Sequence, residues 1–386
     1  MARTLPEPAP DRRWTINGRF LCQRTTGVQR YAREVVASLD GLLAEDHPLG
    51  RGLSVDLLVP AGAADVPPLR AIGLRRAPAL SGHLWEQITL ACRARGGILS
   101  LGNTSTLLRR HQVVCIHDLN TMLAPESYTR RFRMLYRVLL PLLGRRARTV
   151  ATVSRFSADA IVRAGVAPRT KVVVAPNGHE HVLRWRRSTW AASPGGARPD
   201  TIVVLGSLAP HKNLATLLRI APDLARDGLR LAVVGRVDRA VFGDALAPAT
   251  GSAVAWLGEL PDAALAELVS ESLCLAFPSL MEGFGLPPLE AMVLGCPVVA
   301  SDRASIPEVC GDAALYAPAL DPAAWRERFL ALRDDPELRR EMIRRGRLRA
   351  RAFSWRASAE TYLRAMAEAD GLALPEAGVR PEALAV

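Results

Sequence analysis

Short apolar, β-branched runs alternate with helical apolar periodicity along the whole chain. Amphipathic stretches such as NLATLLRIAPDLARDG separate most of these runs. In chain order the runs read RWTINGRF, SVDLLVP, GGILSL, QVVCIHD, TVATVS and KVVVAP, then TIVVLGS, RLAVVG, VAWLG, LCLAFP and PVVAS. Strands that alternate with helices in this way predict parallel sheets flanked by helices.

The pattern breaks once, at residues 184–200, where the sequence RWRRSTWAASPGGARPD has no periodicity and gathers Ser, Pro, Gly and Ala. A chain of 386 residues is long for a single core, because domains cluster near roughly 100 to 200 residues. We therefore predict a linker at 184–200, one doubly wound domain over 1–183, a second over 201–350, and a cleft between them. Residues 371–386 lack periodicity and are expected to be disordered.

Composition is that of a globular protein, with 49% hydrophobic and 23% charged residues. The longest apolar run, YRVLLPLLG, is broken by Pro141 and falls short of the ~20 residues that span a bilayer. The N-terminal MARTLPEPAPDRRW has no apolar core of a secretory signal, so we expect the chain in the cytoplasm.

Cysteines are scattered, without a Cys-x-x-Cys pair, which favours buried free thiols over disulfides or zinc ligands. They are Cys22, Cys92, Cys115, Cys274, Cys296 and Cys310.

A formal net charge of +12 attracts anions in general: nucleotides, anionic lipids or nucleic acid. Few aromatic residues and no zinc-finger, helix-turn-helix or RNA-binding motif argue against a nucleic-acid partner. The segment TRRFRMLYRVLLPLLGRRAR carries seven arginines and no acid. It could lie on an anionic membrane surface, or be an ordinary helix whose arginines stay solvated.

Loops at the carboxyl ends of the predicted strands are the places where open α/β sheets bind ligands. The loop SLMEGFG follows the strand LCLAFP, and Pro287 or Pro288 would lie in the first turn of the next helix. Gly283 and Gly285 would leave backbone amides open to a phosphate. Glu290, in that first turn, could accept hydrogen bonds from two ribose hydroxyls; alternatively it only complements the helix N-terminus, worth about 0.3–1 kcal/mol.

Three further loops have the same position. GSLAPHKNL carries Lys212, which could stabilise the charge on a leaving diphosphate or be a solvated surface lysine. TTGVQRYAREVVASLD carries Gly27, which could admit a ligand to the backbone or form a plain turn. QVVCIHDLNTMLAPESY carries His117 and Asp118, a ligand-facing pair or a local hydrogen bond.

Taken together, these motifs resemble retaining glycosyltransferases of family 4, over roughly residues 13–365. PSLMEGFGLPPLEAMVLGCPVVASDRASIPEVCGDAALY is similar to the family's C-terminal signature, and GSLAPHKNL to its strand-end loop. The resemblance implies the α/β fold called GT-B, two Rossmann-like doubly wound domains facing a cleft. It also implies that residues 351–370 form a helix packing back on the first domain, and that the nucleotide sugar binds mainly to the second.

The same resemblance implies catalytic roles for Glu282 beside the donor sugar, His117 facing the sugar hydroxyls and Lys212 on the diphosphate. Many relatives carry an arginine five residues before this lysine, where Ser207 stands here. Arg236 or Arg303 could then supply the second cation. The expected donor-binding residues are Gly27, Gly206, Ser207, Arg236, Gly283, Phe284, Gly285, Leu286 and Glu290.

The function so implied is transfer of a hexose, with GDP-mannose the first donor, to a glycan or lipid-linked acceptor in bacterial surface polysaccharide synthesis. UDP-glucose, UDP-N-acetylglucosamine and dTDP-rhamnose remain alternative donors. No metal and no cofactor are expected, since no Asp-x-Asp motif follows a predicted strand. The lipid-linked acceptor slightly favours peripheral contact with the inner face of an anionic membrane. A sugar-nucleotide epimerase, a phosphorylase of the same fold and a nucleic-acid-binding protein are the rival hypotheses.

Overall fold

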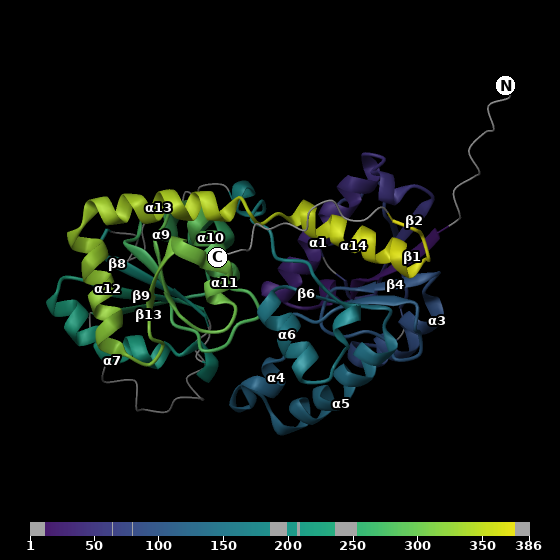
Figure 1. Cartoon of the computed structure of the whole chain (residues 1–386), viewed down its shortest axis with the longest axis horizontal. Helices are drawn as coiled ribbons and strands as arrows, with labels where there is room; N and C mark the ends of the chain where they lie inside the picture. The colour runs from purple at the N-terminus through teal and green to yellow at the C-terminus, as the bar shows by residue number, and fades with distance from the viewer. Residues whose placement is uncertain are drawn as a thin grey trace. The chain divides into compact units, whose positions relative to one another are not determined.

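The computed structural model describes residues 12–63, 65–78, 80–185, 199–206, 209–235 and 253–374 (Figure 1). Most of the predicted linker and of the predicted C-terminal tail lies outside these residues. Contacts divide the chain into two units. Among the described residues, the first holds those up to Leu119, Met134–Asn177 and residues 355–374, and the second holds Asn120–Arg133 and Gly178–Ser354.

The first unit is built on a fully parallel sheet with the strand order β3-β2-β1-β4-β5-β6-β7. Its central strands β4, β5 and β6 are buried along their whole length, as expected where helices cover both faces of a parallel sheet. The strands are β1 (Arg12–Asn17), β2 (Leu53–Val59), β3 (Gly73–Arg76), β4 (Gly97–Ser100), β5 (Gln112–Cys115), β6 (Thr149–Thr152) and β7 (Val172–Val174).

Helices α1 (Gly27–Ala44) and α14 (Trp355–Ala369) pack side by side in this unit (Figure 1). The hydroxyl groups of Tyr31 and Tyr362 lie 2.9 Å apart, and Tyr31 also donates to the carbonyl of Ala175. Both tyrosines are fully buried, and this pairing satisfies their polar ends. The other helices are α2 (Gly82–Leu84), a π-helical turn (Trp85–Leu90), α3 (Ala91–Arg93), α5 (Arg130–Arg146), which belongs to this unit from Met134 on, and α6 (Arg155–Arg163).

The second unit repeats the arrangement with the order β10-β9-β8-β11-β12-β13, again all parallel. Trp325 and Phe329 of α12 are completely buried in its core. The strands are β8 (Thr201–Leu205), β9 (Arg230–Val234), β10 (Val254–Gly258), β11 (Cys274–Phe277), β12 (Val298–Ser301) and β13 (Ala314–Ala317). The helices are α4 (Asn120–Leu123), α7 (Leu214–Arg226), α9 (Asp262–Glu271), α10 (Leu286–Leu294), α11 (Ile306–Cys310), α12 (Pro322–Asp334) and α13 (Pro336–Ala350).

Both sheets therefore have the strand order of a Rossmann fold, which confirms the predicted α/β class. The direction of the chain along the sheet reverses between β1 and β4 in the first unit and between β8 and β11 in the second. Crevices outside the carboxyl ends of such strand pairs are the preferred ligand sites of this architecture.

Two other predictions concern the burial of the cysteines and membrane-spanning helices. Cys22 and Cys92 are exposed, so the prediction of buried thiols is wrong for these two; the remaining four cysteines are buried, and all six are free. Cys22 ends a short 3-10 turn after β1, where the chain has left the sheet. Within the described ranges, no helix is both long enough and apolar enough to cross a membrane.

Candidate functional site

The loops after β8 and β11, two neighbouring strands, bring together two of the predicted residues. Lys212 Nζ lies 2.6 Å from Glu282 Oε1, and the two side chains are 25% and 12% exposed. The ammonium also lies 5.9 Å from the ring centroid of Phe277, the last residue of β11. A partly buried, paired lysine thus marks the point where the strand order of the second sheet reverses.

Asn213 fixes the Lys212 loop to its neighbours. It has a left-handed backbone with φ 54°, which asparagine tolerates better than most residues. Its side-chain amide donates to the carbonyl groups of Pro278 and Ala319, at 3.1 and 2.7 Å. The amide of Leu280 donates to the carbonyl of His211 at 2.8 Å. These bonds hold the two strand-end loops in one arrangement.

The Glu282 loop leads into α10 through Gly285, whose φ of 109° is a conformation that side chains rarely adopt. Ser305 holds this loop from the other side, with its hydroxyl 3.0 Å from the carbonyl oxygen of Glu282 and 2.8 Å from that of Phe284. The ring of Phe284 is buried and packs edge-on against Phe353. Gly283, Phe284, Gly285 and Leu286 therefore form a rigid turn at the N-terminus of α10.

Glu290 lies one helical turn further on. Glu290 was predicted to lie in the first turn of this helix, and that prediction is wrong. Because α10 begins at Leu286, Glu290 is its fifth residue, and the first turn has no acidic residue. The carboxylate is almost buried and its Oε1 lies 2.9 Å from Nε2 of His181, which is 1% exposed. His181 was not predicted from the sequence, because it lies 109 positions away from Glu290, in an irregular stretch after the first domain's strands.

His211 precedes Lys212 and contacts the segment that leaves the first unit's β5. Its Nδ1 lies 2.8 Å from Ser127 Oγ, and its ring stacks on Tyr128. Burial lowers the pKa of His211, and the positive charge of Lys212 lowers it further. The imidazole is therefore neutral near pH 7, and the positive charge of this loop resides on Lys212.

Which side chain would supply the second positive charge at the diphosphate is still a prediction. Ser207 and Arg236, two of the residues in question, lie outside the described part of the chain. Arg303 is described; its side chain is more than half exposed and its Nε lies 3.4 Å from Asp302.

Gly206 has φ 154° and its carbonyl oxygen would lie 2.2 Å from a Cβ on Gly235. The ends of β8 and β9 approach so closely that only glycine fits at 235.

In the first unit, His117 follows β5 and is buried. Its Nε2 lies 2.8 Å from the carbonyl of Leu101, its amide donates to Asn103 Oδ1, and the edge of its ring meets Tyr31. Burial lowers the pKa of His117 to about 4, although the Leu101 carbonyl opposes the shift. His117 is thus a neutral imidazole that donates from Nε2 to the backbone.

Gly27 is the first residue of α1, after a capping box formed by Thr26 and Gln29. A Cβ on Gly27 would meet no atom within 4 Å, and its φ is not in the left-handed region. Packing and backbone geometry therefore do not require glycine at this position, which leaves room beside the backbone.

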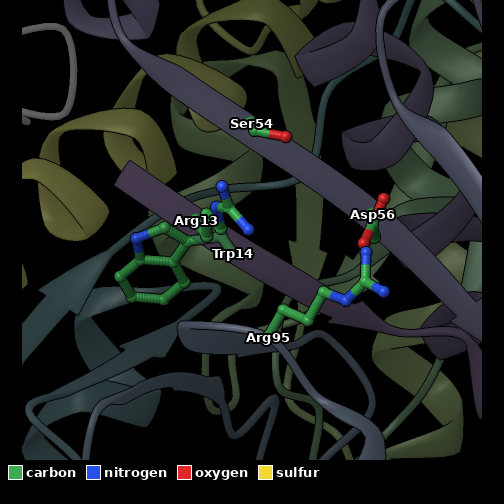
Figure 2. A pocket seen from close by; sticks show the side chains of 5 residues that line it. All are labelled: Arg13, Trp14, Ser54, Asp56 and Arg95. Carbon is green, nitrogen blue, oxygen red and sulfur yellow. The ribbon is translucent and has the colours of Figure 1, made fainter. Parts of the chain in front are cut away.

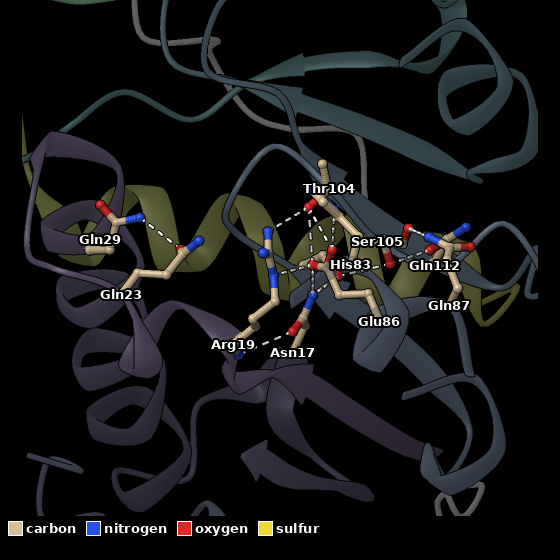
Figure 3. Close-up of polar contacts among 11 residues, drawn as sticks. Asn17, Arg19, Gln23, Gln29, His83, Glu86, Gln87, Thr104, Ser105 and Gln112 are labelled. Atoms are coloured by element: carbon tan, nitrogen blue, oxygen red, sulfur yellow. Dashed lines mark hydrogen bonds and ion pairs between the residues drawn. The ribbon is translucent and has the colours of Figure 1, made fainter. Parts of the chain in front are cut away.

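A buried polar network that was not predicted from the sequence lies at the other switch point, between β1 and β4 (Figure 3). Glu86, 1% exposed, lies 3.0 Å from Arg19 Nε, 2.8 Å from Asn17 Nδ2, 2.8 Å from Thr104 Oγ1 and 3.2 Å from His83 Nδ1. Burial raises the pKa of this carboxyl, but the bonds to His83, Asn17 and Thr104 and the charge of Arg19 outweigh it and leave the pKa below its usual value.

Glu86 is therefore an ionised carboxylate that holds Arg19 and His83 in place. Arg19 and His83 keep 12% and 35% of their side chains exposed. Glu86 stands in a π-helical turn, an irregularity frequent at functional sites. The only sequence signal was a single acid in the apolar run LWEQITL.

A small polar pocket lies elsewhere in the first unit, along β1 and β2 (Figure 2). Figure 2 shows Arg95 reaching toward Asp56 across the strands. The lining residues are Arg13, Trp14, Ser54, Asp56 and Arg95. None of them follows the carboxyl end of a strand, and none is a predicted site residue, so we do not place the functional site there.

Metal ligands are a separate matter. Among the residues that the structure describes, no three His, Cys, Asp or Glu side chains gather closely enough to hold a metal ion.

Solved structures share this two-sheet fold. Sucrose-phosphate synthase from Thermosynechococcus elongatus matches with a TM-score of 0.69 at 18% identity, over 93% of this chain and 99% of that one. The Anabaena protein HepE, solved with UDP and glucose, matches with a TM-score of 0.67 at 16% identity, over 92% of this chain and 100% of its own. The architecture is that of the GT-B class.

Residues 191–349 match the family of glycosyl transferases group 1. O-antigen chain mannosyltransferase B of Escherichia coli is 31% identical over 259 residues, which are 63% of this chain and 66% of the relative. O-antigen chain mannosyltransferase RfbU of Salmonella typhimurium is 26% identical over 235 residues, 60% of this chain and 63% of the relative. The alignments span a little under two-thirds of the length of these relatives.

Proposed function

We propose that this chain is a retaining glycosyltransferase that moves a hexose from a nucleotide diphosphate sugar to a glycan or lipid-linked glycan acceptor. The observation that carries the proposal is the pairing of Lys212 with Glu282 at the strand-order switch point of the second sheet. It falls within the residues that match the glycosyl transferases. Mannose from GDP-mannose is the first choice, because the relatives named above are mannosyltransferases.

In the proposed reaction the bond between the anomeric carbon and the diphosphate oxygen breaks, and the acceptor oxygen attacks from the same face. The leaving phosphate oxygen takes the proton of the acceptor hydroxyl. Lys212 and the N-terminal amides of α10 stabilise the negative charge that grows on the diphosphate. No metal or cofactor is part of this proposal, since these groups supply the positive potential.

Glu282 and Glu290 have different tasks in the proposal. A diphosphate at Lys212 would share the ammonium with the Glu282 carboxylate, which then lies next to the donor sugar. Glu290 accepts hydrogen bonds from the ribose hydroxyls, and His181 holds its carboxylate in position from 2.9 Å. A buried carboxylate fixed in this way loses little freedom when it binds a ligand.

For the acceptor we propose the first unit, where Arg19 and His83 stand partly exposed at the switch point between β1 and β4. A guanidinium held by a buried carboxylate can donate to sugar hydroxyls, and an imidazole whose Nδ1 donates to that carboxylate can accept from a hydroxyl at Nε2. Arg19→Gln should raise the KM for the acceptor and leave the slow hydrolysis of the donor, measured without acceptor, unchanged. Equal losses in both assays would contradict an acceptor role.

A panel of sugar nucleotides tests donor binding directly. GDP-mannose, UDP-glucose, UDP-N-acetylglucosamine and dTDP-rhamnose are each added to the protein, and the unfolding temperature is measured. Ligand at about 100 times its Kd stabilises the folded state by about 2.7 kcal/mol, so the true donor should stand out. Glu290→Gln should weaken this stabilisation, whereas Glu327→Gln, on the solvent side of α12 and 70% exposed, should not. Stabilisation by none of the four would overturn the proposal.

A further inference from the structure

Helix α5 (Arg130–Arg146) is labelled in Figure 1. It exposes apolar side chains on its solvent side. Met134 is 69% exposed, Leu135 45%, Val138 59% and Leu142 41%. We call these four residues the α5 outer face. When large apolar side chains are exposed on a soluble domain, they mostly occur singly. Four of them within nine consecutive residues therefore need an explanation.

The helical repeat explains why these side chains gather. Met134, Val138 and Leu142 follow one another at intervals of four and form one stripe, with Leu135 beside it. The opposite side of the helix is buried and contains Tyr136, Leu139, Leu140, Leu143 and Gly144. Helix α5 is therefore apolar on both sides, and the residues that the structure describes cover only its inner side. A surface helix normally turns a polar face to water.

All the charged side chains of α5 itself are arginines. Arg130, Arg131, Arg137 and Arg145 are exposed on the same helix, and the sequence has no Asp or Glu from residue 127 to residue 158. The other arginine-rich helix, α13, differs in this respect. There Glu337 pairs with Arg340, and Glu341 pairs with both Arg344 and Arg345. The arginines of α5 have no such acid on their helix.

We propose that the α5 outer face docks on an anionic lipid membrane. The four apolar side chains would enter the boundary between headgroups and acyl chains, and the arginines would reach the lipid phosphates with their stems along the apolar surface. Uncompensated positive charge beside apolar side chains matches an anionic bilayer in both respects. A protein partner would instead need acidic groups around an apolar patch. Binding to a protein in place of a membrane is the alternative that the test must exclude. The inference goes beyond the transfer reaction and does not depend on it.

Vesicle flotation tests this surface. The full chain is mixed with vesicles of phosphatidylcholine alone or of equal parts phosphatidylcholine and phosphatidylglycerol, and the bound fraction is measured. We expect binding to the anionic vesicles only. The double variant Met134→Gln, Val138→Gln should bind about tenfold more weakly, because it removes two side chains that would leave water. Arg137→Gln combined with Arg145→Gln should remove the preference for anionic lipid.

Matched controls separate this surface from general stickiness. Leu320 and Leu348 are 66% and 61% exposed and lie outside α5, so Leu320→Gln combined with Leu348→Gln should bind like the wild type. All variants should keep the wild-type unfolding temperature, since the exposed side chains contribute little to the core. No binding to anionic vesicles would overturn the proposal. So would an equal loss of vesicle binding in the Met134, Val138 variant and the Leu320, Leu348 variant. So would self-association in sedimentation that the Met134, Val138 variant abolishes.

Discussion

At the scale of residues, lysine is rare in this protein, and Lys212 lies at the point where the strand order of the second sheet reverses. The chain has 50 basic residues, of which Lys171 and Lys212 are the only lysines. Lys171 donates to the carbonyl groups of Arg145 and Ala147, a local structural role. Lys212 instead pairs with Glu282 at a switch point. A compact ammonium on a flexible stem can turn from this carboxylate to a ligand, which a planar guanidinium does less readily.

The same scale shows what the sequence could predict and what it could not. Lys212 and Glu282 were predicted because each lies in a loop after a strand, and Glu290 because it lies in the helix that follows the Glu282 loop, in a motif that resembles the family signature. Ser305, His181 and Asn213 were not, because their importance comes from partners that are 23, 109 and 65 positions away. The Glu86 network was missed for the same reason: Asn17, Arg19 and Thr104 meet it only once β1 and β4 are paired.

His117 gives a pH prediction at this scale. Its pKa is about 4 in the folded chain and about 6.5 when unfolded. Between these values the unfolded chain takes up a proton that the folded chain does not, so stability falls as the pH drops through this window. The loss can reach about 3 kcal/mol. His117→Gln keeps a donor for Leu101 but does not titrate, so it should lose less stability on acidification.

Urea unfolding at pH 7 and near pH 4 measures this difference. The unfolding midpoint of the wild type should drop further than that of His117→Gln between the two conditions. Midpoints that fall in parallel would show that His117 is not held neutral by the fold.

At the scale of elements, the pattern of apolar residues predicted eleven strands, and each of those runs contains one. It missed β3 and β13. The first, Gly73–Arg76, is an exposed edge strand with two arginines, so no apolar run reveals it. The second, Ala314–Ala317, is only four residues long and half composed of alanine, which has little strand preference. Both gain their conformation from pairing with a neighbouring strand, at Asp56↔Gly73 and Val298↔Ala314 for example.

The start of α10 depends on Gly285 in the same way. A side chain at φ 109° costs about 1–3 kcal/mol, so Gly285→Ala should lower the unfolding temperature by several degrees and disturb the Glu282 loop. Gly27→Ala is the matched control, since its Cβ would meet no atom within 4 Å. It should leave the unfolding temperature unchanged and weaken donor binding only if a diphosphate approaches that backbone. Equal unfolding temperatures for the two variants would contradict this account of α10.

At the scale of the whole molecule, two sheets with the same strand order carry two polar sites, each at a switch point. The predicted α/β class followed from the alternation of strands and helices, and the GT-B arrangement from the family resemblance, but the placement of the sites required the strand order. The net charge of +12 suits both of the proposed anionic ligands, a sugar nucleotide and a lipid surface. It does not distinguish between them, and only the local geometry of Lys212 and of α5 does so.

The central claim is that Lys212 acts on the diphosphate of a sugar donor. Mass spectrometry of nucleotide released from GDP-mannose tests it most directly, with wild type, Lys212→Ala and Lys171→Ala compared under the same conditions. We predict that the wild type and Lys171→Ala release GDP at similar rates and that Lys212→Ala is slower by about 100 to 1,000 times. Release at one rate by all three proteins would contradict the account.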